Sequence, residues 1–184
     1  VCKNLICQKP FCRDLEEAEQ ALVAAGDARV IIHENIRNQP WYAEAVRLVK
    51  NGAVGAPFQV SFRMRPGDGQ GPDAYLARQP YFQHMPRFLV HETAIHWIDL
   101  FRAVFGEPDG VYADLRRLNP AIAGEDAGVI MLDYDDGRRA VYDGNRLVDH
   151  IAEDRRRSMG DLLVEGETGV LRVDGEGRIW VRRF

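Results

Sequence analysis

The feature that most constrains the fold is a series of short β-type segments in the second half of the chain. Residues 57–64 alternate between apolar and polar side chains, and further runs of this kind follow at 111–118, 128–134, 138–142, 161–165, 170–173 and 179–183. Gly-containing turns separate several of them, and Asp135-Asp136-Gly137 favours a tight hairpin. Consecutive hairpins predict a mostly antiparallel open sheet. Such a sheet needs helices on one face, so the pattern predicts an α+β fold.

The first forty residues follow a different pattern. An apolar run at 4–7 precedes an Ala- and Glu-rich amphipathic helix at 14–25, and β-branched residues follow at 29–33. Asp14 is suited to cap this helix and Gly26 to end it. A strand, a helix and a strand predict a right-handed parallel crossover, the unit of doubly wound nucleotide-binding sheets. Because one unit cannot form a sheet alone, we expect the earlier strands to belong to a longer parent protein.

Candidate chemistry lies on a helix predicted around residue 95, which is the main element available to cover the sheet. Glu92, His96 and Asp99 stand at steps of four and three and so share a helix face. A histidine one turn from a carboxylate can be held in one tautomer, as a general acid or base near neutral pH requires. A core-lining helix whose polar side chains only satisfy buried partners would show the same spacing, so both interpretations stay open.

Composition narrows the class of protein. The 184 residues are 46% hydrophobic and carry a formal net charge of -4, which is typical of a globular protein and argues against a nucleic-acid partner. The basic cluster at 155–157 has acidic neighbours and is interpreted as a solvated loop. No apolar run is long enough to span a bilayer, and the opening segment lacks the apolar stretch of a secretory signal. We therefore expect a cytoplasmic protein with no membrane partner.

Three other sequence features are weighed against metal or phosphate chemistry. Cys2, Cys7 and Cys12 are an odd, widely spaced set, which favours reduced thiols and predicts no metal site. The glycines of residues 67–72 do not open a helix and have the wrong spacing for a phosphate loop, so a mobile surface loop is expected. His91 and His96 would point roughly 140° apart on a helix, which disfavours a zinc-protease site.

Together, the segments resemble the glucose-fructose oxidoreductase, inositol dehydrogenase and rhizopine catabolism (Gfo/Idh/MocA) family. In chain order, the resemblance rests on a Glu-Lys-Pro-like strand end at 5–10, an Asn-x-Arg-x-x-Pro segment at 35–40, a Gly-x-x-Gly-x-Pro entry into a C-terminal sheet at 50–57, an Asp-x-Gly-x-His-x-x-Asp-like helix at 92–100, and a hairpin at 125–137. It covers nearly the whole chain. Residues 1–39 are then a C-terminal remnant of a dinucleotide-binding (Rossmann) domain, and residues 40–184 an α+β domain for substrate binding and oligomerisation.

The resemblance implies an NAD- or NADP-dependent oxidoreductase that passes a hydride between nicotinamide and a sugar, polyol or related hydroxy compound. It implies catalytic roles for Lys9, which would lie between nicotinamide and substrate, and for His96 as acid or base with help from Glu92. A lysine can stabilise a developing alkoxide, and a histidine can exchange the hydroxyl proton. It implies cofactor contacts from Lys9, Pro10 and Arg37, although Arg37 is equally suited to a structural hydrogen bond.

Departures from the family pattern limit these expectations. Gln8 stands where the family has an acidic residue, Glu92 replaces an aspartate, and the glycine fingerprint for the pyrophosphate is absent. We therefore expect the chain to bind NAD poorly and to be inactive alone. A non-catalytic module, kept for ligand binding or self-association, is the alternative. In either case an uncovered sheet face predicts a homo-oligomer, since exposed apolar sheet is a liability in water.

Overall fold

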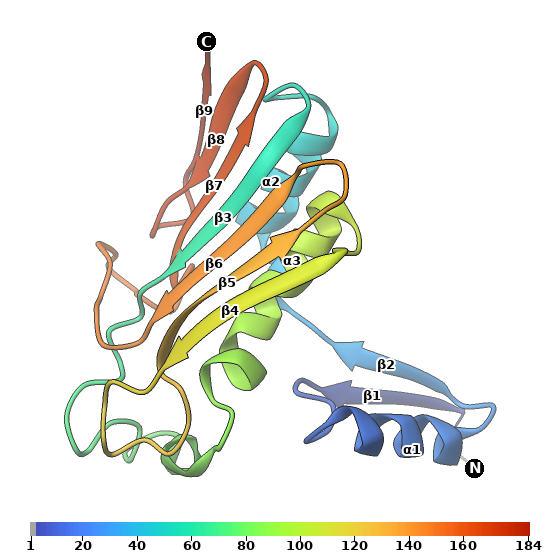
Figure 1. Cartoon of the computed structure of the whole chain (residues 1–184), viewed down its shortest axis with the longest axis vertical. Coiled ribbons are helices and arrows are strands. Elements are labelled where there is room, and N and C mark those ends of the chain that lie inside the picture. The colour runs from blue at the N-terminus through green and yellow to red at the C-terminus, as the bar shows by residue number, and fades with distance from the viewer. Residues whose placement is uncertain (1–2) are drawn as a thin grey trace.

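The computed structural model describes residues 3–184 and consists of a small N-terminal part and a larger sheet domain (Figure 1). In the small part, β1 (Asn4–Gln8) pairs with β2 (Arg29–His33) in parallel, and α1 (Leu15–Ala25) connects them. This parallel pairing confirms the predicted strand-helix-strand unit. The Asp14 side chain accepts the backbone N–H of Glu17, and Gly26 ends the helix at a φ of 54°, as the sequence predicts.

The large domain is built on a seven-stranded sheet with the order β4-β5-β6-β3-β7-β8-β9. Its strands are β3 (Pro57–Met64), β4 (Gly110–Arg116), β5 (Ala127–Asp133), β6 (Arg139–Asn145), β7 (Gly160–Gly166), β8 (Gly169–Val173) and β9 (Ile179–Arg183). All neighbouring pairs are antiparallel except β3 and β6, which run parallel. The predicted mostly antiparallel sheet is therefore confirmed. The parallel pair arises because the chain leaves the sheet after β3 and returns at its edge as β4.

Two helices cover one face of this sheet (Figure 1). They are α2 (Pro40–Lys50), which Pro40 begins, and α3 (Ile95–Phe105), which ends at Gly106. Trp97 on α3 stacks on Phe62 of β3 with 4.2 Å between ring centroids, and its ring centroid is 5.9 Å from that of Tyr142, the neighbour of Phe62 on β6. All three side chains are buried. This aromatic contact fixes α3 to the centre of the sheet.

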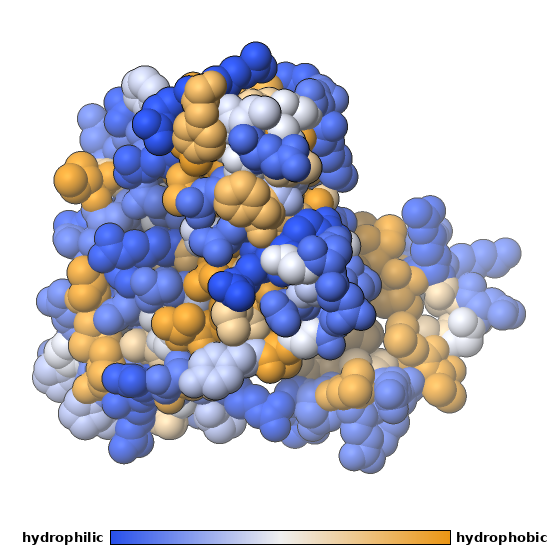
Figure 2. All heavy atoms as spheres, turned by 45° about the horizontal axis from the view of Figure 1, so that its top comes forward, coloured by the Kyte–Doolittle hydropathy of each residue, from blue (hydrophilic) through white to orange (hydrophobic). Residues whose placement is uncertain are grey.

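On the opposite face of the sheet, none of the helices in residues 3–184 lies over the strands (Figure 1). The strand register places Tyr112, Met131, Val141, Ser61 and Leu163 side by side across five neighbouring strands on this face. Tyr112 is largely exposed, and the other four are partly exposed. Figure 2 shows hydrophobic side chains scattered among hydrophilic ones over the large domain rather than gathered in one patch. The fold is thus an α+β layer that is covered on one face, as predicted.

Shorter elements connect these parts. They are the 3-10 turns η1 (Ile36–Asn38) and η2 (Pro80–His84) and the π-helical turn η3 (Leu89–Ala94).

Within residues 3–184, no helix is long and apolar enough to cross a bilayer. Cys7 and Cys12 are free thiols, whereas Cys2 lies outside the described residues. The same residues contain no group of three or more His, Cys, Asp or Glu side chains arranged to hold a metal ion.

Candidate active site

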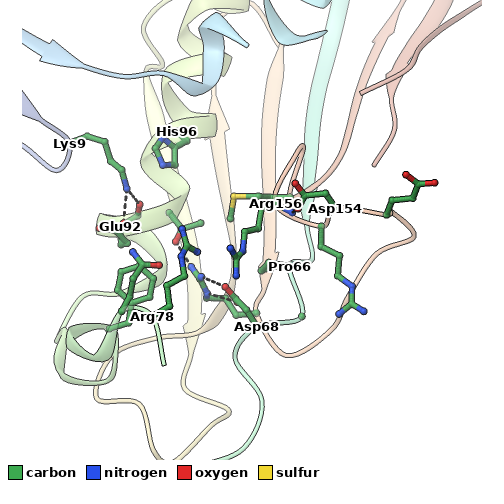
Figure 3. A pocket seen from close by; sticks show the side chains of 16 residues that line it. Lys9, Pro66, Asp68, Arg78, Glu92, His96, Asp154 and Arg156 are labelled. Carbon is green, nitrogen blue, oxygen red and sulfur yellow. Dashed lines mark hydrogen bonds and ion pairs between the residues drawn. The ribbon is translucent and has the colours of Figure 1, made fainter. Parts of the chain in front are cut away.

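Residues of the small part and of the large domain line one cavity of about 660 Å³ (Figure 3). Lys9 lines it from the end of β1, and Glu92, Thr93 and His96 line it from η3 and the start of α3. Loops that follow β3 and β6 form the remaining wall. Lys9 and His96, which are distant in the sequence, therefore face one cavity, as the sequence analysis requires of a shared site.

Lys9 is held by Glu92. Its Nζ lies 2.8 Å from Glu92 Oε1 and also donates to the Glu92 backbone oxygen at 2.5 Å. The two side chains are only 9% and 13% exposed, so the ammonium is paired rather than surrounded by water. The peptide bond between Lys9 and Pro10 is cis, and Pro10 itself does not line the cavity. This ion pair connects the small part of the chain to the large domain.

The predicted continuous helix through Glu92 and His96 is wrong in its first turn. Glu92 lies on the π-helical turn η3, and α3 begins only at Ile95. Hydrogen bonds to the fifth residue widen such a turn, so the one-turn relation expected for an α-helix does not apply. The Glu92 carboxylate contacts Lys9, and within residues 3–184 it makes no hydrogen bond to His96.

His96 instead has a carboxylate partner that the sequence analysis missed. Glu34 lies directly after β2, and its Oε2 and Oε1 atoms are 2.7 and 2.9 Å from His96 Nδ1. Both side chains are nearly buried. Because an ionised carboxylate only accepts hydrogen bonds, Nδ1 carries the hydrogen and Nε2 is the free ring nitrogen. One sequence signal could have indicated Glu34. It directly follows a predicted parallel strand, and ligand sites lie at the carboxyl ends of such strands.

The pKa of Glu34 reflects two opposing effects. Burial alone would raise it, but the hydrogen bond from His96 and the one from the Ile36 backbone N–H lower it. The N–H of Ile36 is 2.7 Å from Glu34 Oε1. The net direction is downward, so Glu34 is ionised at neutral pH and can orient the imidazole ring.

Arg37 and Asp99 form a separate contact outside the cavity. Arg37 Nε is 3.3 Å from Asp99 Oδ2, which links η1 to α3. Burial raises the pKa of Asp99, and the charge of Arg37 opposes that rise. Arg37 does not line this cavity, and its contact with Asp99 matches the structural role that the sequence analysis considered, while the cofactor contact stays a prediction.

The far wall contains residues to which the sequence analysis assigned no role. Arg146 is buried and donates to Asp68 at 2.7 Å, to the hydroxyl of Tyr75 at 2.8 Å and to Thr93 Oγ1. Asp68 belongs to the glycine-containing loop that was expected to be a mobile surface loop. Hydrogen bonds from the Asn119 side chain to two glycine carbonyls also hold this loop. The loop is therefore part of the cavity wall.

The N-terminus of α1 is capped and carries carboxylates in its first turn. A helix N-terminus binds phosphate through free backbone N–H groups and its positive dipole end. In α1, Asp14 already accepts one of these N–H groups, and Glu16 and Glu17 place two carboxylates in the first turn. That terminus does not fit a pyrophosphate.

Solved structures share this architecture. An oxidoreductase from Agrobacterium radiobacter, in complex with NAD+, L-tartaric acid and magnesium, is 29% identical and has a TM-score of 0.83, with 97% of this chain and 51% of that one covered. The WlbA dehydrogenase from Bordetella pertussis, in complex with NADH and UDP-GlcNAcA, is 19% identical with a TM-score of 0.76 over 97% of this chain and 55% of that one. This second likeness concerns the fold alone.

Sequence comparison identifies the family. D-apiose dehydrogenase from Paraburkholderia graminis is 35% identical over 180 residues, which are 95% of this chain and 45% of the relative. D-apiose dehydrogenase from Rhizobium rhizogenes is 32% identical over 75% of this chain and 39% of the relative. The chain thus spans less than half the length of these curated relatives. The family model of the GFO/IDH/MocA C-terminal domain matches residues 42–172. By this match and by the likeness to the dehydrogenases, the chain belongs to the GFO/IDH/MocA family.

Proposed function

We propose that this chain supplies the substrate cavity and the proton-transfer group of an NAD- or NADP-dependent oxidoreductase that acts on a sugar, polyol or related hydroxy compound. One observation carries the proposal. Lys9 and His96, each paired with its own nearly buried carboxylate, line a single cavity. The names of the relatives, which are dehydrogenases of the sugar apiose, support the reaction class and the kind of substrate.

In the proposed mechanism, His96 acts as the base in the oxidative direction. Its Nε2 takes the proton of the substrate hydroxyl, while Glu34 holds Nδ1–H and stabilises the imidazolium that forms. The Lys9 ammonium stabilises negative charge on the hydroxyl oxygen as the proton leaves. A nicotinamide, when bound, supplies the acceptor for the hydride of the same carbon, so that a C=O bond replaces the C–H and O–H bonds. Reduction reverses these steps.

The proposal includes a further dinucleotide-binding region beside the small part. Ile6 is 74% exposed, Leu22 53% and Val23 82%, although they belong to apolar runs on β1 and α1. Apolar side chains on both layers of a strand-helix unit are normally covered by neighbouring strands and helices. We expect this region to hold the pyrophosphate, which the N-terminus of α1 does not fit.

The experiment is a turnover assay of the complete gene product that contains these 184 residues. NAD and NADP are each tested with a panel of sugars and polyols, and cofactor reduction is followed by absorbance. We expect His96→Ala to lower kcat by about 10²- to 10⁴-fold, as loss of a general base does. His84→Ala removes an exposed histidine outside the cavity and serves as the control. Equal turnover of the His96→Ala variant and the wild type would refute the role of His96. Absence of nicotinamide-linked turnover with every compound would favour the non-catalytic module.

The uncovered sheet face also leads us to propose a homo-oligomer. Tyr112, Met131, Val141 and Leu163 lie in one row across the sheet, in which Ser61 separates Val141 from Leu163, and most residues of the rows on both sides are charged. A second copy related by a two-fold axis would bury this row against the same row. The charged flanking rows would then set the orientation of the two sheets.

A further inference from the structure

Two arginines enter the cavity without side-chain partners of their own. Arg78 precedes η2, Arg156 lies in the loop between β6 and β7, and Figure 3 shows them on different sides of the cavity. Among residues 3–184, neither guanidinium has a hydrogen bond or an ion pair. Both side chains are exposed at the cavity wall. Their charge is therefore available to a ligand.

Most other charged side chains of the cavity wall form ion pairs with carboxylates or arginines nearby. Arg146 pairs with Asp68 at 2.7 Å, and Arg155 pairs with Asp149 at 3.2 Å. Asp154 accepts the backbone N–H of Arg156 at 3.0 Å and lies beyond Arg156 from Lys9 in Figure 3. After these contacts, and the pair of Lys9 with Glu92, the wall of the described chain keeps two guanidinium groups, those of Arg78 and Arg156, and two carboxylates, those of Glu153 and Asp154, without a side-chain partner.

We infer that the substrate is a hydroxy compound that carries an oxyanion, either a carboxylate or a phosphate, which Arg78 and Arg156 bind. The inference rests on the proposed function, because it assigns the reacting hydroxyl of the same molecule to His96 and Lys9. A guanidinium offers two parallel N–H donors that match a carboxylate or a phosphate. The ion pair of buried Arg146 with Asp68 holds the loop of residues 67–72 in the cavity wall. The Agrobacterium oxidoreductase bound to L-tartaric acid, a hydroxy acid, agrees with this chemistry.

The test compares matched charged and neutral ligands by isothermal titration calorimetry of the 184-residue chain. L-tartrate and L-threitol share a four-carbon backbone and differ in their carboxylates, while D-glucose 6-phosphate and D-glucose differ in a phosphate. We expect one charged member to bind at least about tenfold more tightly than its neutral partner. Arg78→Ala and Arg156→Ala should each remove about tenfold of that affinity. Arg117→Ala removes an exposed arginine outside the cavity and should change nothing.

The outcomes separate this inference from the proposed function. Tighter binding of L-tartrate identifies a carboxylate and tighter binding of the phosphate ester identifies a phosphate, and either supports the inference. Equal binding within both pairs of compounds would overturn it, and so would no binding of any of the four compounds. Affinities for the charged compounds that are unchanged from the wild type in both Arg78→Ala and Arg156→Ala would also overturn it. The proposed function is judged separately, by the His96-dependent reduction of NAD or NADP in the complete gene product. If the complete gene product turned over neutral sugars only, the proposed function would stand and the inference of an oxyanion-bearing substrate would be refuted.

Discussion

At the scale of single residues, the cavity contains two side-chain pairs, and each includes a glutamate. Lys9 is matched by Glu92, and His96 is matched by Glu34. In the proposed mechanism, the first pair places a positive charge at the reacting oxygen, and the second fixes which imidazole nitrogen can take a proton. Because the pairs do not share a carboxylate, substitution of one glutamate should leave the other pair intact.

Glu34 is therefore expected to act as a positioning residue for His96. In the complete gene product, Glu34→Gln should lower kcat by at least about tenfold with little change in KM, because Glu34 supports the base rather than the substrate. Nitrogen-15 NMR should find the hydrogen of the neutral ring on Nδ1 in the wild type and a mixture of tautomers in the variant. Glu34→Asp should recover part of the activity.

Glu92→Gln provides the matched control for this prediction. It removes a carboxylate of similar burial from the same cavity but leaves the hydrogen bond between Glu34 and His96 in place. We expect its His96 tautomer to equal that of the wild type. If Glu92→Gln changed the tautomer and Glu34→Gln did not, the assignment of the two carboxylates would have to be exchanged.

The lowered pKa of Glu34 predicts how stability depends on pH. Hydrogen bonds to the folded carboxylate outweigh its burial, so the folded pKa lies below the unfolded value of about 4.3. The unfolded state thus binds this proton more readily, and the contribution to stability is present above the unfolded pKa and is lost as the pH falls through the folded pKa. The stability advantage of the wild type over Glu34→Gln should therefore shrink below about pH 4.3. Urea unfolding of both proteins at pH 6 and pH 3.5 measures it, and a growing advantage would contradict the sign.

The residues of the site differ in how far the sequence reveals them. Lys9 and His96 were predicted from family-like segments, and the structure brings both to one cavity. Glu34 was missed because it stands alone after a strand, and only the packing of η1 against α3 moves it beside His96. Arg78 comes from the segment after β3, whereas Arg146 and Arg156 come from the segment between β6 and β7, and no local spacing relates Arg78 to the other two.

At the scale of elements, local periodicity predicted most strands, and two features escaped it. The hairpins of β5 with β6 and of β7 with β8 follow from alternation and turn residues close in the chain. The parallel contact of β3 with β6 depends on a segment of more than seventy residues between them, so no local pattern encodes it. The π-helical turn η3 arises where the chain enters α3, and an α-helical period extended through it misplaces Glu92.

The contact of α3 with the sheet predicts a contrast between two tryptophans. Trp97 is fully buried and stacked on Phe62, whereas Trp180 on β9 is 59% exposed. Trp97→Ala should lower the free energy of unfolding by about 3–5 kcal/mol, since a large core side chain leaves a cavity. Trp180→Ala should cost about 1 kcal/mol or less. Urea unfolding followed by circular dichroism measures both, and equal losses would show that α3 does not depend on this stack.

At the scale of the whole molecule, exposed apolar side chains form two surfaces, and these lie on different parts of the chain. The small part exposes apolar side chains of β1 and α1, and the large sheet exposes the row that includes Met131 and Leu163. The ion pair of Lys9 with Glu92 joins the two parts at the cavity between these surfaces. Cofactor binding and self-association are therefore assigned to separate faces, so a substitution on the sheet should leave the cavity unchanged.

This separation allows a direct test of the proposed homo-oligomer. Leu163→Arg places a charge at the β7 end of the row, where a facing copy would have to bury it, whereas Ile151→Arg changes a side chain that is 98% exposed in a loop. We expect sedimentation velocity at micromolar concentration to give a dimer or larger species for the wild type and for Ile151→Arg, and a monomer for Leu163→Arg. Circular dichroism should confirm that both variants are folded. A wild type that sediments as a monomer would exclude the sheet face as a self-association surface, because burial of the row is the reason for pairing.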